Sequence, residues 1–100
     1  MASRDNGKIA GSVLITGASG GIGRELARSF AARRCDLALA ARNEAALEAL
    51  GRELASTYDV RVRILPVDLS LPHAAEAVAS ALNGAGVDIG VLVNNAGAVT

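Results

Sequence analysis

One run near the start of the chain sets the expected architecture: Ser12-Val13-Leu14-Ile15-Thr16-Gly17-Ala18-Ser19-Gly20-Gly21-Ile22-Gly23. Its apolar part does not alternate with polar residues, which is typical of a parallel strand buried on both faces. The glycines permit a sharp turn, because glycine tolerates positive φ and has no side chain to block a ligand. A helix is expected from Gly21 to Arg33. The run therefore predicts a buried strand, a glycine-rich turn and the start of a helix.

The glycine turn is a candidate phosphate site. The first N–H groups of a helix have no partner within the helix, and the helix dipole places partial positive charge there. A phosphate is therefore the expected ligand. Gly23 would let the helix pack close to the strand. The alternative is a structural turn that binds nothing. A Walker-type phosphate loop is excluded because no Lys-Ser or Lys-Thr pair follows the glycines.

Apolar patterning along the rest of the chain predicts further strands and helices. The strands are expected from Asp36 to Ala41, Val60 to Val67 and Ile89 to Val93, and the helices from Asn43 to Tyr58 and Pro72 to Leu82. Arg61 and Arg63 alternate with apolar residues, which is typical of a strand at a sheet edge. Right-handed crossovers then predict the spatial strand order 3-2-1-4.

Helical spacing of apolar side chains predicts the buried face of each helix. The expected stripes are Ile22, Leu26 and Phe30 in the first helix, Leu47, Leu50 and Leu54 in the second, and Ala75, Val78, Ala79 and Leu82 in the third. Asn43 is expected to cap the start of the second helix.

The composition excludes several classes of function. The chain has 100 residues, with 10 basic and 10 acidic side chains, so its charge gives no electrostatic case for binding nucleic acid or a membrane. Cys35 is the only cysteine, which rules out an internal disulfide and a zinc cluster and fits a cytoplasmic location. Residues 1–11 are expected to be a flexible lead-in and not a secretory signal, and 100 residues suffice for one domain and no more.

Three motifs in this order resemble the short-chain dehydrogenase/reductase family. They are the pattern Thr-Gly-x-x-x-Gly-x-Gly from Thr16 to Gly23, Asp68-Leu69 after the third strand, and Asn94-Asn95-Ala96-Gly97 after the last. The resemblance extends from about Gly11 to Gly97. It implies a Rossmann-type α/β fold, in which a doubly wound parallel sheet lies between helices in three layers. Residues 12–100 would be the N-terminal, cofactor-binding portion of a longer reductase domain.

The resemblance also implies residues that contact the cofactor. In the glycine turn these are Gly17, Ser19, Gly20, Gly21, Ile22 and Gly23. Asp68 would accept a hydrogen bond from the adenine amino group, and Leu69 would line the adenine pocket. Asn94 would steady the sheet, while Ala96 and Gly97 would pack beside the cofactor ribose.

Each of the two later motifs also has a plain structural interpretation. Asp68 stands near the start of a helix, with Ser70 as a possible cap. Asn94 and Asn95 would form an ordinary turn after a buried strand.

The residue after the second strand predicts which nicotinamide nucleotide binds. In a dinucleotide fold an acid at this point bonds the ribose 2′-hydroxyl, whereas an arginine accommodates a 2′-phosphate. Here Arg42 follows the strand, and Asp36 stands at its other end. Because arginine pairs with phosphate through two charge-assisted bonds, NADP(H) is expected, with Ser19 adding a hydroxyl. The alternative is a solvated surface arginine.

The family's catalytic residues are absent from the sequence. The resemblance implies a tyrosine four residues before a lysine, yet Tyr58 is followed four residues later by Val62, and the only lysine is Lys8. No catalytic residue or metal site is predicted, and His73 is expected to be a solvated surface residue.

Two functions stay open at this point. The first is the NADP(H)-binding part of a longer reductase, which transfers hydride between nicotinamide and a small carbonyl or alcohol and is expected to be a homo-oligomer. The second is a complete, non-catalytic nucleotide-binding or interaction module.

Overall fold

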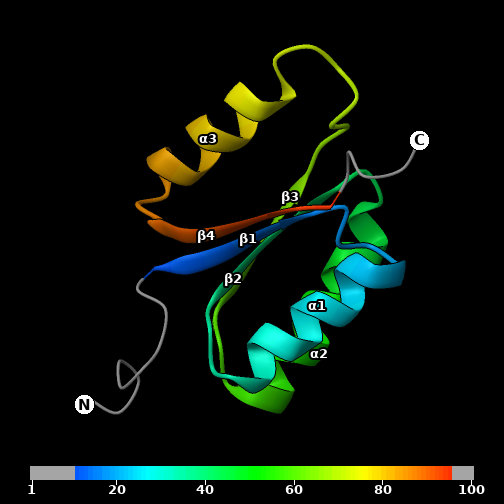
Figure 1. The fold of residues 1–100 in the computed structure, drawn as a ribbon, viewed down its shortest axis with the longest axis vertical. Helices are drawn as coiled ribbons and strands as arrows, with labels where there is room; N and C mark the ends of the chain where they lie inside the picture. Colours follow the sequence, from blue (N-terminus) through cyan, green and yellow to red (C-terminus); the bar gives the residue numbers. More distant parts are fainter. Residues whose placement is uncertain (1–10, 96–100) are drawn as a thin grey trace.

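The computed structural model describes residues 11–95, which form a four-stranded sheet with helices on both faces (Figure 1). The strands are β1 (Ser12–Thr16), β2 (Leu37–Ala41), β3 (Val62–Pro66) and β4 (Ile89–Asn94). The helices are α1 (Gly21–Ala32), α2 (Glu44–Tyr58) and α3 (Ala74–Gly84). The predicted lead-in up to residue 10, and Ala96 and Gly97 of the predicted site, lie outside the described residues.

The sheet has the predicted strand order, β3-β2-β1-β4, and every neighbouring pair is parallel. The predicted edge position of β3 is confirmed, and Arg63 in this strand and Arg61 just before it are both exposed. Helices α1 and α2 cover one face and α3 covers the other, so the three-layer arrangement is confirmed (Figure 1). The helix that follows β1 and the helix that precedes β4 lie on opposite faces of the sheet, although β1 and β4 are neighbouring strands. Open α/β sheets bind ligands at such a point, at the carboxyl ends of the strands.

The core explains why the two central strands, β1 and β2, do not alternate between apolar and polar residues. All five residues of β2 are buried. Leu37 and Leu39 pack toward α1 and α2, whereas Ala38 and Ala40 belong to a second cluster with Val78 of α3. A central strand with apolar neighbours on both faces therefore reads as a continuous apolar run.

The second helix follows its prediction closely. The side chain of Asn43 accepts a hydrogen bond from the backbone N–H of Ala46 at 3.0 Å, which caps the first turn. Leu47, Leu50 and Leu54 are buried on one stripe. The hydrophobic spacing and the capping residue thus predict both where this helix begins and how it is rotated.

The predicted faces of the other two helices were wrong in part. In α1 the buried stripe is Gly23, Ala27 and Ala31, and Ile22 is 70% exposed. The reason is the close approach of α1 to β1, which admits only small side chains at the contact. Leu26 and Phe30 are half-buried at the side of this contact.

Helix α3 is likewise rotated and begins later than expected. Ala74 is buried together with Val78 and Leu82, whereas Ala75 and Ala79 are exposed. The helix starts at Ala74 instead of Pro72, because His73 adopts a left-handed conformation with φ 67° and serves as the N-cap residue. Five of the eleven residues of α3 are alanine and lie on different sides of the helix, so the hydrophobic contrast between its faces is small and the sequence pattern does not fix the rotation.

Candidate functional site

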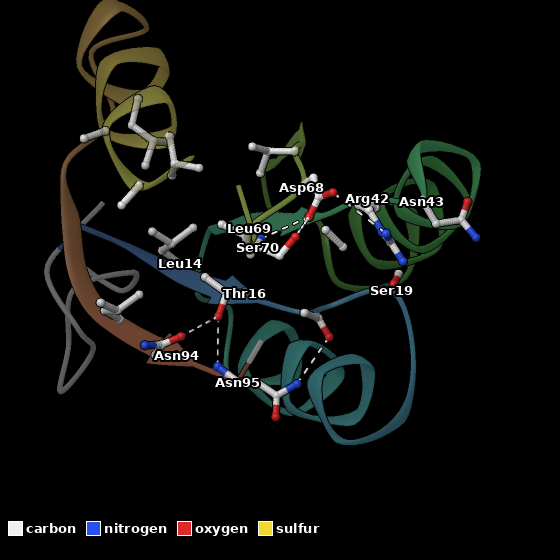
Figure 2. Close-up of a pocket in the computed structure, with 18 of the residues that line it drawn as sticks. Leu14, Thr16, Ser19, Arg42, Asn43, Asp68, Leu69, Ser70, Asn94 and Asn95 are labelled. Carbon is white, nitrogen blue, oxygen red and sulfur yellow. Dashed lines mark hydrogen bonds and ion pairs between the residues drawn. The ribbon is translucent and has the colours of Figure 1, made fainter. Parts of the chain in front are cut away.

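A groove follows the carboxyl ends of β1, β2 and β3 and continues beneath α3 (Figure 2). Its volume is about 1270 Å³. The predicted cofactor-binding residues that line it are Gly17, Ser19, Gly20, Gly21, Ile22, Arg42, Asp68, Leu69 and Asn94. These residues come from four separate segments of the sequence, and the parallel sheet brings them to one edge. Gly23 does not line the groove and has a packing role instead.

Two glycines at the start of α1 have different structural roles. Gly21 has φ 57°, in the left-handed region, and a Cβ atom there would meet nothing within 4 Å. At Gly23 a Cβ atom would overlap the carbonyl oxygen of Gly17 and lie 2.9 Å from Nδ2 of Asn95. Gly21 therefore shapes the turn beside open space, whereas Gly23 lets α1 approach the end of β1.

The start of α1 offers backbone N–H groups to the groove. Gly20 is the N-cap residue in an extended conformation, and no side-chain cap bonds to the first turn. Ile22 in that turn is exposed and lines the groove, so its side chain flanks the N–H groups without filling the hollow. An anion that reached this turn would meet unpaired donors and the positive end of the helix dipole.

A polar cluster joins the end of β1 to the end of β4 (Figure 2). The hydroxyl of Thr16, which is 7% exposed, donates to Oδ1 of Asn94 at 3.1 Å and accepts from the backbone N–H of Asn95 at 2.9 Å. Nδ2 of Asn95 donates to the carbonyl oxygen of Gly17 at 3.3 Å. The cluster therefore fixes the glycine turn relative to the neighbouring strand.

Thr16 and Asn95 were not among the predicted site residues. A signal for Thr16 was present, since it is a hydroxyl-bearing residue at the end of a buried apolar strand, where a polar group needs a partner. Asn94, predicted to steady the sheet, takes part through its bond from Thr16.

Arg42 and Asp68 meet across the ends of β2 and β3. Arg42 follows β2 with its side chain 77% exposed, and its Nη1 lies 3.8 Å from Oδ2 of Asp68. Oδ1 of Asp68 accepts from the hydroxyl of Ser70 at 2.6 Å and from its backbone N–H at 3.0 Å. Ser70 thus bonds to Asp68 and does not cap α3, whose N-cap residue is His73, with no side-chain capping hydrogen bond.

These bonds change the acidity of Asp68. The hydroxyl of Ser70 contributes most to holding the pKa of the Asp68 carboxyl below its ordinary value. The backbone N–H of Ser70 and the charge of Arg42 act in the same direction, while partial desolvation opposes them. The carboxyl is therefore an anion at neutral pH and accepts hydrogen bonds only.

The remaining reactive side chains lie away from the groove or are paired locally. Cys35 is buried in the core between the sheet and α1, and His73 is exposed, with its Nδ1 2.8 Å from Oε1 of Glu76. Within residues 11–95 no group of three His, Cys, Asp or Glu side chains could hold a metal ion. No helix in this part of the chain is long and apolar enough to cross a membrane.

The donors that line the groove fit a phosphorylated dinucleotide. The N–H groups at the start of α1 suit a pyrophosphate, and the guanidinium of Arg42 suits a further phosphate. Val67 and Leu69 supply apolar surface beside the carboxylate of Asp68, which can accept from an amino group. Gly20 and Gly21 leave open the space that side chains would otherwise fill.

Comparison with known proteins agrees with this geometry. A family model described as short chain dehydrogenase matches residues 11–100. The chain is 42% identical, over 95% of its length, to an NADP-dependent 3-hydroxy acid dehydrogenase of Schizosaccharomyces pombe. It is 40% identical, over 84% of its length, to a very-long-chain 3-oxoacyl-CoA reductase of Meyerozyma guilliermondii. The chain spans 36% of the first relative and 25% of the second.

Solved structures show the same similarity. A short-chain dehydrogenase from Sphingobium yanoikuyae in complex with NADPH matches 87% of this chain with a TM-score of 0.76 and 43% identity, over 34% of its own length. L-Sorbose reductase from Gluconobacter frateurii, complexed with NADPH and L-sorbose, matches 92% with a TM-score of 0.83 and 35% identity, over 35% of its length.

Proposed function

This chain belongs to the short-chain dehydrogenase family, and from that membership we propose that it is the NADP(H)-binding part of an oxidoreductase. The reaction proposed for the whole protein is hydride transfer between the nicotinamide ring and a carbonyl or alcohol substrate. The bound nicotinamide would supply the hydride donor or acceptor. A cytoplasmic location and assembly into a homo-oligomer are further parts of the proposal.

One observation carries the choice of NADP(H): Arg42 occupies the carboxyl end of β2, beside the glycine turn, where NAD-binding folds place an acid. Its guanidinium is exposed and reaches the same groove as Ser19. A bidentate, charge-assisted pair with a 2′-phosphate is the strongest interaction that such a side chain offers. The NADPH bound to the Sphingobium yanoikuyae structure supports the same choice.

The other residues of the groove would hold the rest of the nucleotide. The first turn of α1 would bind the pyrophosphate through its N–H groups. Asp68 would accept from the adenine amino group, and Leu69 would pack on the adenine ring. The cluster of Thr16, Asn94 and Asn95 would not touch the adenosine half but would keep the glycine turn in place.

A binding titration of the native protein tests the proposal. The Kd for NADPH should be lower than that for NADH, and the protein should oxidise NADPH in the presence of a carbonyl substrate. Binding of NADPH without oxidoreductase activity on a panel of ketones would favour a non-catalytic nucleotide-binding module. Failure to bind either nucleotide would contradict the proposal.

A further inference from the structure

The carboxylate of Asp68 makes a different contact with each of its two oxygens. Oδ1 is held by the hydroxyl of Ser70 at 2.6 Å and by the backbone N–H of the same residue at 3.0 Å. Oδ2 faces Nη1 of Arg42 at 3.8 Å. Figure 2 shows these contacts as a chain that runs from Ser70 through Asp68 to Arg42. Because two bonds from one residue grip one oxygen, the direction in which the other oxygen points is fixed.

The link to Arg42 restrains the guanidinium without using up its donors. At 3.8 Å the contact is an ion pair but too long for a hydrogen bond, whose donor–acceptor distance is about 2.7–3.2 Å. Among residues 11–95 it is the one ion pair that Arg42 makes. A long, exposed side chain with this single attraction keeps its N–H groups available to an incoming anion. Exposed pairs of this kind are also weak, so the pair can adjust when an anion binds.

We propose that Ser70 is a positioning residue for cofactor selection: by orienting the carboxylate of Asp68, it places the guanidinium of Arg42 to receive the 2′-phosphate of NADP(H). The inference rests on the proposed function. Ser70 acts through Asp68 and contributes to the difference between NADPH and NADH more than to binding of the nucleotide as a whole.

The same geometry sets the direction of the effect. The charge of Asp68 attracts the guanidinium of Arg42 but repels a dianionic phosphate. The position of the carboxylate decides whether the attraction or the repulsion has the larger effect on binding. With Oδ1 bound to Ser70, the negative charge is partly neutralised by two donors, and Oδ2 is aimed at the guanidinium. Without the hydroxyl of Ser70 the carboxylate turns more freely and its charge is less satisfied, and both changes disfavour the phosphate.

The test compares the Kd values for NADPH and NADH in the native protein and in Ser70→Ala, Ser70→Thr and Ser56→Ala. Ser56 is a matched control, because it is an exposed serine on α2 whose hydroxyl donates to the nearby carbonyl of Glu53 at 3.3 Å. Ser70→Ala should reduce the preference for NADPH by about threefold to tenfold, the size of effect expected for loss of one typical hydrogen bond. Ser70→Thr should restore the preference, and Ser56→Ala should leave it unchanged.

Other outcomes would overturn the inference. Equal weakening of both nucleotides in Ser70→Ala would assign Ser70 a purely structural role, and an increased preference for NADPH would mean that Asp68 acts mainly by repulsion. An unchanged preference would also contradict the proposal. If Ser70→Ala gave any of these results while the native protein still preferred NADPH, the inference about Ser70 would be wrong but the proposed function would be unaffected. A native protein that binds neither nucleotide would remove both.

Discussion

The backbone carbonyl of Gly17 lies directly against Gly23, so that a β-carbon at position 23 would overlap the oxygen. This contact joins the end of β1 to the first turn of α1 and explains why the stripe that α1 buries consists of glycine and alanine. The same carbonyl oxygen of Gly17 also accepts a hydrogen bond from Nδ2 of Asn95 at 3.3 Å, so the contact includes the end of β4 as well.

Gly23→Ala should destabilise the fold, whereas Gly20→Ala should not. The added methyl at position 23 must displace backbone, and such overpacking costs about 1–3 kcal/mol. At position 20 a Cβ atom meets nothing within 4 Å, and the extended backbone accepts any residue. Urea unfolding of the two variants gives the comparison, and equal stability would show that α1 can move away from β1 without cost.

Thr16→Val should also weaken the fold while keeping the shape of the side chain. It removes the hydroxyl that accepts from the backbone N–H of Asn95 and donates to Asn94. The N–H of half-buried Asn95 then loses its partner, whereas the exposed side chain of Asn94 can bond to water. An unsatisfied buried polar group costs about 1–3 kcal/mol. Thr16→Ser retains the hydroxyl and should recover most of the loss in the same unfolding experiment. If valine and serine proved equivalent, the hydroxyl would have no structural role.

The Arg28–Glu53 pair predicts a specific dependence of stability on pH. Arg28 of α1 donates through Nε and Nη2 to the two carboxylate oxygens of Glu53 on α2, at 3.0 and 3.1 Å. The hydrogen bond from Arg28 is the largest cause that holds the pKa of Glu53 below its ordinary value of 4.5. A carboxyl with a lowered pKa in the folded state stabilises the protein above its unfolded pKa and ceases to do so as the pH falls through the lowered value.

Glu53→Gln should therefore be less stable than the native protein at pH 7, and the difference should disappear in acid below the lowered pKa. Unfolding midpoints across this pH range measure the difference. Glu48→Gln, an exposed substitution on the same helix, is the control for a general loss of negative charge. A difference that persisted unchanged into acid would contradict the role of the ion pair.

The sequence predicts the sheet more fully than the contacts at its edge. Strand order followed from continuous apolar runs in the central strands and from the alternation of Arg61 and Arg63 with apolar residues at and just before β3. Burial on one face or on two faces gives different sequence patterns. Asn43 was found for a similar reason, since capping joins residues only three apart.

What the sequence missed depends on tertiary approach. The close packing of Gly23 was predicted, but the rotation of α1 that follows from it was not, because apolar periodicity does not show how near Gly23 lies to Gly17. Thr16 and Asn95 are joined by a bond between residues 79 positions apart, and the link from Asp68 to Arg42 likewise needs two strand ends to be neighbours. Local patterns predict elements, whereas these contacts appear only after the elements have packed.

The most direct measurement is the change in the Kd values for NADPH and NADH on Arg42→Asp. Replacing the guanidinium by a carboxylate removes the charge-assisted bonds to a 2′-phosphate and adds repulsion, so NADPH should weaken by about tenfold to a hundredfold and NADH much less. Arg52→Asp, at an exposed position of α2 outside the groove, makes the same change of charge and should leave the ratio of the two Kd values unchanged. An unchanged ratio of the two Kd values in Arg42→Asp would contradict the assignment of Arg42 to the 2′-phosphate.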